Sequence, residues 1–460
     1  MSIVTPEEMR AIDASAPDPV EELVRRAGHA VGRAAVRMLG GSYGRRVAVI
    51  AGTGNNGADG RVAGEWLRRR GVSVEVFAAA ACPDRLPPSD LVIDAAYGTG
   101  YRASCREPWT PPGIGGGPVL AVDIPSGLDA STGGHAGAVL AADRTVTFQA
   151  LKPGLLFGDG PSLSGEVEVV DIGLDASRAT SHLVDVGDVA AWLPRRPVDA
   201  HKWSTAVRIV AGSPGMLGAA GLAARGAARC GAGLVAVSSP GGNAPVPLEV
   251  LQPALPDTEW ADEVVDGLGR HRALVVGPGL GRRSATVASI RRVISRSTLP
   301  VVADGDALHA IATGDRLALA DRPAPTVVTP HDGEFEQLTG APPAPDRIEA
   351  TRSLASRLGC TVLLKGPATV IADPTGAVLV VDHGDERLAT AGSGDVLAGM
   401  IGALLAADLP PLRAAATAAW LHADAARRGP RVGLVASDLP DLLPATIAAT
   451  TSGLHERHGR

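Results

Sequence analysis

The sequence predicts two α/β domains, each with three layers, in which helices cover both faces of a mostly parallel sheet. Short apolar segments that suit buried strands alternate with longer segments of helical spacing. The chain has 57 glycines and 36 prolines among 460 residues, so turns are frequent. The alternation restarts after the proline-rich, charged stretch Trp192–Asp199, which predicts domains at residues 1–192 and 199–460.

Helical spacing opens the first predicted domain, and strands follow it. Residues 5–40 are predicted to be helical with an interruption at Pro17–Pro19, because Thr5 can cap a helix whose first turn holds a proline and two acids. Strands are predicted at residues 46–51, 72–77, 91–94, 119–123 and 144–148. Candidate functional side chains follow these strands directly, at the sheet edge where open α/β folds bind ligands.

The same alternation predicts the elements of the second domain. Strands are predicted at residues 207–211, 234–237, 273–276, 300–303, 326–329 and 361–364. An Ala-rich helix is predicted over residues 218–229, and an apolar helix over 396–407. Because a helix that is apolar all round must be buried, residues 396–407 are expected in the core.

Composition excludes several classes of protein. The net charge is −6 and no basic block is present, which argues against a nucleic-acid partner. The four cysteines, at 82, 105, 230 and 360, lack metal-ligand spacing and resemble reduced cytosolic cysteines. The first residues lack the features of a signal peptide, and no apolar run is long enough to span a membrane. We therefore expect a soluble cytoplasmic protein without a membrane partner.

The segment Ala391-Gly-Ser-Gly-Asp-Val-Leu-Ala-Gly399 is the most informative motif. Small residues at a helix start let backbone N–H groups approach a ligand, and a helix N-terminus favours negative charge. Asp395 lies where a general base could meet both a phosphate and a hydroxyl group, which suits phosphoryl transfer. The alternative is a glycine-rich turn capped by an aspartate.

Polar residues follow other strands of the second domain. In Thr329-Pro-His-Asp-Gly-Glu-Phe335, Glu334 could orient magnesium and His331 could hydrogen-bond a substrate, or the histidine could lie in a surface turn. Lys365 could meet a phosphate, although a lone lysine is usually solvated. Asp304 and Asp306 follow a strand as well, with helix N-capping as the alternative.

Three glycine-containing loops follow strands in the first domain. They are Gly52-Thr-Gly-Asn-Asn-Gly-Ala-Asp-Gly60, Asp94-Ala-Ala-Tyr-Gly-Thr-Gly100 and Asp123-Ile-Pro-Ser-Gly-Leu-Asp129. The first loop has the strand-to-helix setting of a phosphate-binding loop, or it is a simple Gly/Asn turn. A single aspartate after a strand is commonly a helix cap, but three such loops offer carboxylate, carbonyl and hydroxyl oxygens that suit a hard cation.

These three loops, in this order, resemble the NAD(P)H-hydrate epimerase family over most of residues 1–190. The resemblance implies a Rossmann-like fold and a potassium ion held by Asn56, Asp94 and Ser126. It implies substrate contacts by Asn55, Asn56, Gly57, Ala58, Asp59, Gly98, Thr99, Gly100, Tyr101, Arg102, Ala103, Ser104 and Asp123. We take Asp123 as the candidate acid/base. Lys152 is a second candidate, with a surface lysine near a turn as its alternative.

The motifs of the second half resemble the ADP-dependent NAD(P)H-hydrate dehydratase family, of ribokinase-like fold, over about residues 199–455. The resemblance implies that the hydrate contacts Ala219, Gly279, His331 and Asp395. It implies that the nucleotide contacts Lys365, Gly366, Pro367, Ala368, Thr369 and Gly394. Four residues depart from the family patterns, and they are Ala58, Trp203, His309 and Ser393. Ala58 would be strained if that position needed a positive φ, and Trp203 would affect the entrance of the site.

Together the resemblances imply a bifunctional enzyme that repairs hydrated nicotinamide cofactors. The first domain would interconvert the R and S epimers of NADHX and NADPHX, and the second would dehydrate the S form with ADP. K⁺ in the first domain, Mg²⁺ in the second and homo-oligomers are implied by the same analogy. The alternatives are a ribokinase-like small-molecule kinase fused to a Rossmann-like domain, and a first domain that only binds ligands.

Overall fold

The computed structural model describes residues 1–101, 109–314 and 319–457, with side chains up to residue 452. The chain forms two compact units, Met1–His182 and Leu183–Arg460. The second unit begins before helix α5 (Val186–Trp192), whereas the sequence predicted that the first domain extends to residue 192. The difference arises because α5 packs against helices α13 (Pro411–Arg428) and α14 (Leu439–Arg457) of the second unit.

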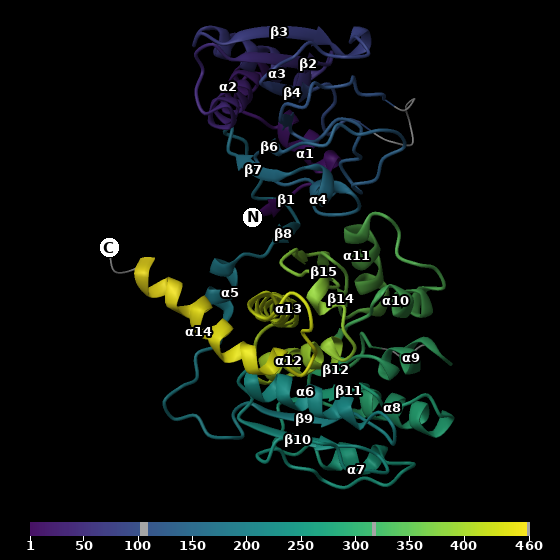
Figure 1. The fold of residues 1–460 in the computed structure, drawn as a ribbon. Helices are drawn as coiled ribbons and strands as arrows, with labels where there is room; N and C mark the ends of the chain where they lie inside the picture. The colour runs from purple at the N-terminus through teal and green to yellow at the C-terminus, as the bar shows by residue number, and fades with distance from the viewer. Residues whose placement is uncertain (102–108, 315–318, 458–460) are drawn as a thin grey trace. The chain divides into compact units, whose positions relative to one another are not determined.

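The first unit is built on a parallel sheet with the strand order β3-β2-β4-β5-β6-β7 in the described residues (Figure 1). The strands are β2 (Arg46–Ala51), β3 (Ser73–Ala78), β4 (Leu91–Ala95), β5 (Val119–Val122), β6 (Arg144–Phe148) and β7 (Glu166–Val170). The five predicted strands are confirmed to within one or two residues. Strand β7 was not predicted, because it lacks the continuous apolar run of the other strands and lies only partly buried at the sheet edge.

Helices cover one face of this sheet. They are α1 (Pro6–Ala14), α2 (Val20–Leu39) and α3 (Asn55–Arg68). The predicted start of α1 is confirmed, because Thr5 and Glu8 form a reciprocal capping box. The apolar side of α2, including Ala27 and Val31, packs with strand residues such as Val49 in one buried cluster.

Loop segments cover the other face of the same sheet. Leu86, Trp109 and Leu140 pack there against Ile50 and Val92. The regular elements outside the main sheet and long helices are short. They are β1 (Ser2–Ile3), η1 (Ala79–Ala81), η2 (Pro153–Leu155), α4 (Gly160–Leu163) and β8 (Ser181–Leu183), of which β1 and β8 pair antiparallel. The third layer is thus made of loops in the described residues, whereas the sequence predicted helices on both faces.

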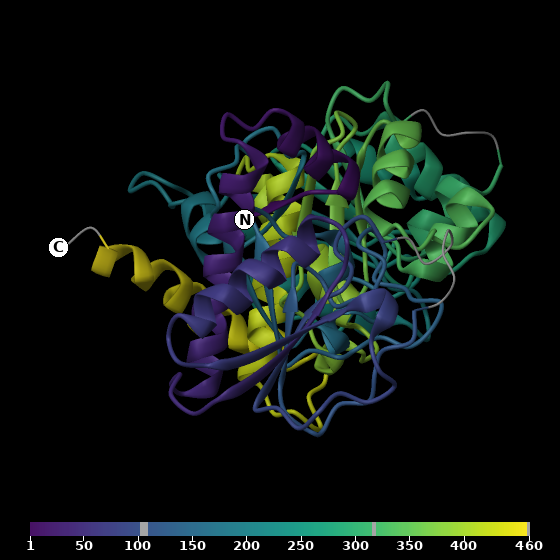
Figure 2. The same ribbon diagram turned by 90° about the horizontal axis from the view of Figure 1, so that it is seen from above.

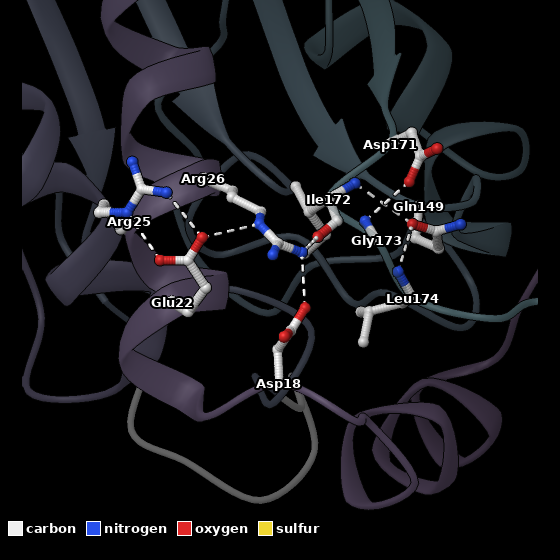
Figure 3. Close-up of polar contacts among 9 residues, drawn as sticks. All are labelled: Asp18, Glu22, Arg25, Arg26, Gln149, Asp171, Ile172, Gly173 and Leu174. Carbon is white, nitrogen blue, oxygen red and sulfur yellow. Dashed lines mark hydrogen bonds and ion pairs between the residues drawn. The ribbon is translucent and has the colours of Figure 1, made fainter.

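An arginine of α2 holds the segment that follows β7 (Figure 3). Arg26 donates a hydrogen bond to the carbonyl oxygen of Ile172 (2.9 Å) and pairs with Asp18 (2.8 Å) and Glu22 (3.0 Å). The Gln149 side chain accepts from the backbone N–H groups of Ile172 (3.3 Å) and Leu174 (3.1 Å). These contacts fix Ile172 next to the carboxyl ends of the strands.

The second unit also has a mostly parallel sheet, ordered β16-β15-β14-β13-β12-β11-β9-β10 in the described residues (Figure 1). Its strands are β9 (Ala206–Val210), β10 (Leu234–Ser238), β11 (Ala273–Val276), β12 (Val301–Ala303), β13 (Thr326–Val328), β14 (Thr361–Leu364), β15 (Thr369–Ala372) and β16 (Val378–Val381). The six predicted strands are confirmed to within one residue. Strands β15 and β16 were not predicted, and both pair antiparallel.

Helices α6 (Leu217–Arg229), α12 (Ser393–Ala406) and α13 pack on one face of this sheet. Residues 396–406 of α12 are all buried, which confirms the predicted core helix. Helix α14 packs on α6 and α13 with its first turns and then leads away from the rest of the second unit in both views (Figures 1 and 2). In the part of the chain that the structure describes, no helix has the length and apolar character needed to cross a membrane.

The remaining helices of the second unit follow the central strands. They are α7 (Ala261–Asp266), α8 (Ser284–Arg296), α9 (Asp306–Ala312), α10 (Asp332–Thr339), α11 (Arg347–Leu358) and η3 (Glu386–Leu388). The connections from β12 to α9, from β13 to α10 and from β14 to β15 leave from one edge of the sheet, the edge of the carboxyl ends. These connections hold most of the predicted functional residues of the second unit.

The contact between α6 and α12 depends on Gly399, which gives a first testable prediction. A Cβ atom at Gly399 would lie 2.0 Å from the carbonyl oxygen of Ala223. Gly399→Ala is therefore expected to force the helices apart and to lower the free energy of unfolding by about 1–3 kcal/mol. Urea denaturation measures this change. Gly218→Ala, on α6 with open space around it, is the control, and equal stability of both variants would contradict the packing argument.

Candidate active sites

A cavity of about 430 Å³ lies at the carboxyl ends of the strands of the first unit. Predicted residues from all three glycine-containing loops line it, together with parts of α1 and α2. The predicted site residues on its wall are Asn55, Asn56, Asp59, Gly98, Thr99, Gly100, Tyr101, Asp123 and Lys152. Gly57 and Ala58 lie in the same first turn of α3. The predicted Arg102, Ala103 and Ser104 lie outside the described residues.

The first glycine loop is glycine-rich because backbone segments approach each other closely. A Cβ atom at Gly57 would lie 2.0 Å from the carbonyl oxygen of Gly52, and one at Gly52 would lie 2.0 Å from that of Ala96. Helix α3 starts directly after this loop at Asn55. Ala58 lies inside the helix, where its N–H bonds to the carbonyl of Gly54, and its φ is not positive. The strain considered for Ala58 is therefore absent.

Asp94, Ser126 and Asn56 offer oxygen atoms in buried positions. Asp94 accepts hydrogen bonds from the backbone N–H (2.8 Å) and the hydroxyl (2.6 Å) of Ser126. Burial raises the pKa of Asp94 to about 6, although these bonds and one from Ala96 favour its ionised form. Both polar atoms of the Asn56 amide are buried without a hydrogen-bond partner among the described residues. A buried amide without a partner is costly unless a ligand satisfies it.

Asp123 is held by a buried lysine at the end of β5. Its carboxylate lies 2.7 Å from Lys152 Nζ and accepts from the Thr147 hydroxyl (3.0 Å) and the Thr99 N–H (3.3 Å). The φ of Asp123 is +68°, an uncommon value for a residue with a side chain, and such strain concentrates at functional sites. Lys152 is 1% exposed and also donates to Thr147 and to the carbonyl of Phe148. The surface-lysine alternative for Lys152 was therefore wrong.

Two further carboxylates belong to this cavity. Burial, followed by repulsion from Asp123 and Asp13, raises the pKa of Asp59 to about 8. Asp13 on α1 also lines the cavity, and burial raises its pKa against the attraction of Lys152. Sequence reasoning missed Asp13, because an aspartate within an amphipathic helix carries no local sign of a site. The cavity thus holds the Asp123–Lys152 ion pair beside two carboxyl groups whose pKa values are raised by burial.

In the second unit, Lys365 is the centre of the predicted site. Its ammonium lies 2.6 Å from the Asp304 carboxylate, which also accepts from the Thr329 hydroxyl at 2.6 Å. Burial lowers the pKa of Lys365, but the nearby carboxylates of Asp304, Glu334 and Asp395 raise it by more. The pKa of Lys365 is therefore above its usual value. Asp304 does not cap a helix, because Gly305 occupies the N-cap position of α9. Its role is to hold Lys365, which the sequence did not predict.

Asp395 lies in the first turn of α12. Burial raises its pKa to about 7, with repulsion from Asp304 adding to the effect and attraction by Lys365 opposing it. A Cβ atom at Gly394 would lie 3.2 Å from Lys365 Nζ, so the glycine loop and Lys365 are in contact. Gly392 precedes the helix with φ +91°, which favours glycine. A carboxyl group with a pKa of about 7 can exchange a proton at neutral pH.

His331 serves as the N-cap of α10. Its Nδ1 atom accepts hydrogen bonds from the N–H groups of Gly333 (3.0 Å) and Glu334 (3.3 Å), while Glu334 accepts from the His331 N–H (2.9 Å). The second ring nitrogen, Nε2, lies 3.6 Å from the Glu334 carboxylate. The Nδ1 atom of His331 thus caps α10, and Nε2 is the ring atom that could bind a substrate. Burial raises the pKa of Glu334.

Ala219 and Gly279 meet on the same side of the second site. A Cβ atom at Gly279 would lie 2.9 Å from the Ala219 Cβ, and the φ of Gly279 is +60°. The nearby Ser213 hydroxyl donates to the Gly279 carbonyl (2.9 Å). The loop that holds Gly366, Pro367 and Ala368 connects β14 to β15 and ends at Thr369. The structure therefore places the predicted hydrate and nucleotide residues at one edge of the sheet.

His422 on α13 is a residue that sequence reasoning missed. It is buried, a hydrogen bond joins it to the backbone of Ser393, and its Nε2 has no partner among the described residues. Burial lowers the pKa of His422 to about 4, so the ring is neutral. An alanine-rich helix gave no signal for this contact. The Ser393 hydroxyl bonds to the Leu388 carbonyl (2.9 Å), so the departure at Ser393 supports the loop.

Trp203 does not lie at the entrance to the Asp395 site. It precedes β9, at the amino ends of the strands, where it packs edge-on against His271 at 5.7 Å between ring centres. The expectation that Trp203 would affect the entrance of the site was therefore wrong. His309 lies on α9, where its carbonyl accepts from Thr313. Within the described residues, no cluster of three or more His, Cys, Asp or Glu side chains has the arrangement of a metal site.

Comparisons with known proteins cover both units. Residues 207–448 match the NAD(P)H-hydrate dehydratase family, and residues 20–87 and 78–154 match the family described as the YjeF-related protein N-terminus. The chain is 36% identical to the bifunctional NAD(P)H-hydrate repair enzyme of Moorella thermoacetica over 97% of both chains. This chain belongs to the bifunctional NAD(P)H-hydrate repair enzymes. The corresponding enzyme of Mycobacterium tuberculosis is 40% identical over 88% of both chains.

Solved structures resemble the second unit. The ADP/ATP-dependent NAD(P)H-hydrate dehydratase of Bacillus subtilis, co-crystallised with ATP and Mg²⁺, is 30% identical with a TM-score of 0.51. The match covers 58% of this chain and 97% of the Bacillus chain. A ribokinase-like protein of Enterococcus faecalis has a TM-score of 0.53 at 21% identity, which shows the fold alone. The chain is thus a two-part repair enzyme with a ribokinase-like second unit. The alternative of a small-molecule kinase is not better supported by these comparisons.

Protonation of Asp59 gives a testable prediction for the first unit. Its pKa is about 8 in the folded chain and 3.8 in the reference state, so the folded state binds the proton more tightly. Stability is therefore lost as the pH rises from about 4 to about 8. Asp59→Asn should raise the free energy of unfolding by about 2–4 kcal/mol at pH 8, with a difference that shrinks toward pH 4. Hydrogen exchange of the α3 amides measures this change.

The exposed Asp84 supplies the control for this prediction. Asp84→Asn removes the same charge at the surface and should leave the pH dependence of α3 exchange unchanged. An Asp59→Asn variant that follows the wild-type profile at every pH would show that Asp59 is ionised in the folded protein.

Proposed function

We propose that the second unit dehydrates the S epimer of NADHX and NADPHX with ADP, and that Asp395 is its general base. The observation that carries the proposal is the position of Asp395 at the N-terminus of α12, beside Lys365 and with a pKa of about 7. A base with this pKa is half ionised at neutral pH. The adjacent ammonium and backbone N–H groups can stabilise phosphate charge.

The proposed reaction has two stages. Asp395 takes the proton of the hydroxyl at C6 of the hydrated ring, and that oxygen attacks the terminal phosphorus of ADP, which releases AMP. The phosphate then leaves C6 with the C–O electrons, assisted by the lone pair of the ring nitrogen. Loss of the C5 proton restores the C5=C6 double bond. In this scheme the N–H groups of residues 391–394 stabilise the developing charge, except that of Ser393, which donates to the Thr390 carbonyl (3.3 Å). Lys365, held by Asp304, compensates the charge of the phosphates.

ADP as the phosphate donor and Mg²⁺ as its counter-ion are part of this proposal. The Bacillus subtilis relative, described as ADP/ATP-dependent, supports a nucleoside di- or triphosphate with Mg²⁺. Glu334 is the carboxylate that we assign to orient Mg²⁺, which supplies charge neutralisation on the phosphates when bound. Because no cluster of three such side chains occurs in the described residues, most of its ligands would be phosphate and water oxygens.

We propose that the first unit interconverts the R and S epimers at C6, with Asp123 as acid/base. The support is the Asp123–Lys152 ion pair in a cavity that also holds the protonated form of Asp59. An ion-paired carboxylate beside a carboxyl group of raised pKa suits proton removal and proton delivery. Lys152 is a positioning residue in this scheme, because its buried ammonium binds Asp123, the Thr147 hydroxyl and the carbonyl oxygens of Phe148 and Ala150.

We assign a potassium ion to Asn56, Asp94 and Ser126. The Asn56 amide oxygen has no partner in the described residues, and Asp94 and Ser126 add oxygen atoms in the same loops. An oxygen-only donor set suits a hard cation, so these residues fit the ion. When bound, K⁺ would satisfy the Asn56 oxygen and lower the pKa of Asp94.

Two further proposals concern the protein as a whole. The free cysteines at 82, 230 and 360 support a cytoplasmic location. Analogy with the family supports homo-oligomers.

The second site is tested by Asp395→Asn. This change keeps the size of the side chain but removes the base, so the rate of ADP-dependent dehydration should fall by about 10²–10⁴-fold. Wild-type dehydration should rise with pH through about 7, because the ionised form of Asp395 is the base. Restored absorbance of the dihydronicotinamide measures the rate. Epimerisation should be unchanged in the variant. Full dehydratase activity would show that Asp395 is not the general base.

The first site is tested by Asp123→Asn. Epimerisation of an R/S mixture, followed by chromatography of the two forms, should slow by about 10²-fold or more, because the acid/base group is lost. Dehydration of pure S hydrate is the internal control and should keep its wild-type rate. An unchanged epimerisation rate would remove Asp123 from the mechanism.

A further inference from the structure

A larger cavity of about 1200 Å³ lies in the second unit at the opposite edge of the sheet from Asp395. Its wall includes Thr205 before β9, Gly231 before β10 and Arg272 before β11, and therefore surrounds the amino ends of these strands. Leu404 and Ala407, at the C-terminal end of α12, form part of the same wall. Asp395 is at the other end of that helix, about 14 Å from Leu404 and about 18 Å from Ala407 at 1.5 Å per residue.

The wall of this cavity carries a surplus of positive charge. Five arginines line it, and they are Arg195, Arg196, Arg229, Arg270 and Arg272. Asp408 is the one carboxylate among the described lining residues, and both its oxygens bind Arg272, at 2.9 and 2.8 Å. Arg229 lies 3.7 Å from Asp441. Arg195, Arg196 and Arg270 have no carboxylate partner in the described parts of the chain, although the whole chain has a net charge of −6.

An aromatic and apolar surface lies beside these arginines. Trp203 is fixed edge-on against His271, and the Arg270 guanidinium lies 5.5 Å from the centre of the Trp203 ring. Leu193, Leu404 and Ile447 line the same cavity. A flat ring can stack on an indole, and arginine forks bind phosphate oxygens in pairs. The wall therefore combines the two kinds of surface that a ring-bearing phosphate needs.

We propose that this cavity is a second nucleotide site, in which Arg195, Arg196 and Arg270 bind the phosphates and Trp203 contacts the base. Its volume is ample for one nucleotide, because ligand pockets commonly measure about 300–1,000 Å³. The site is separate from the Asp395 centre, since the two lie at opposite edges of the sheet. This proposal stands independently of the proposed function, which assigns another nucleotide to Lys365 and Gly394.

Equilibrium dialysis of the full chain with ADP tests the proposal by counting bound nucleotides. The wild type should bind two equivalents of ADP per chain. Arg195→Ala/Arg196→Ala should keep one equivalent and weaken the other by about 10- to 100-fold, because two charge-assisted contacts are lost. Arg292→Ala/Arg296→Ala, on the surface of α8, removes the same charge and should keep both equivalents.

A blocking variant separates this site from the Asp395 site. Gly394→Leu places a side chain against Lys365 and should remove only the equivalent that survives in the double arginine variant. If the wild type binds one equivalent, which Gly394→Leu abolishes and the arginine changes do not affect, the cavity proposal is overturned while the proposed function stands. If the single equivalent instead depends on Arg195 and Arg196, the cavity proposal holds and the assignment of ADP to Lys365 fails.

The role of the base is tested with inorganic tripolyphosphate. Trp203→Ala should weaken ADP binding at the arginine-dependent site by about tenfold and leave tripolyphosphate binding there unchanged, because only ADP has a ring that can stack on the indole. Equal loss of both ligands, or no loss of either, would overturn the assignment of a nucleotide to this site. Circular dichroism of each variant confirms that the fold is retained.

Discussion

An ion pair between a lysine and a buried aspartate at the end of a strand organises each site of this enzyme. Lys152 holds Asp123 in the first unit, and Lys365 holds Asp304 in the second, at 2.7 and 2.6 Å. A lysine removed from water is costly unless a carboxylate and further acceptors compensate it, so the loops that supply these partners must fold together. The two pairs differ in one respect. Asp123 is itself the proposed reacting group, whereas Asp304 leaves Lys365 available to phosphate.

Close backbone packing positions the groups that surround these pairs. In the first unit, Gly52 and Gly57 allow the strand end and the start of α3 to touch, which brings Asn56 and Asp59 to the cavity. In the second unit, Gly399 and Gly226 allow α12 and α6 to approach, and His422 forms a hydrogen bond with the backbone of Ser393. Both arrangements place a helix N-terminus at the carboxyl edge of a parallel sheet, where its N–H groups face a ligand.

Local patterns in the sequence predicted the strands, the long helices and most residues around both sites. Apolar runs and glycine loops can be recognised within a few neighbouring residues. They did not predict contacts made between distant segments. The burial of Lys152, the approach of Asp13 and the support from His422 all depend on packing that no short motif encodes. The loop layer of the first unit was missed for the same reason, since Leu86, Trp109 and Leu140 cover the sheet without helical spacing.

Helix α12 links two regions that are distant in the fold. Its first turn holds Asp395, and its last turn forms a wall of the arginine-lined cavity. Residues 396–406 are wholly buried, so the helix cannot shift at one end without repacking along its length. A ligand that moved the end near Leu404 would therefore act on the packing around Asp395, and linkage makes any such effect on affinity reciprocal. In the proposed scheme, a nucleotide in the arginine-lined cavity and a ligand at Asp395 would therefore share one buried helix.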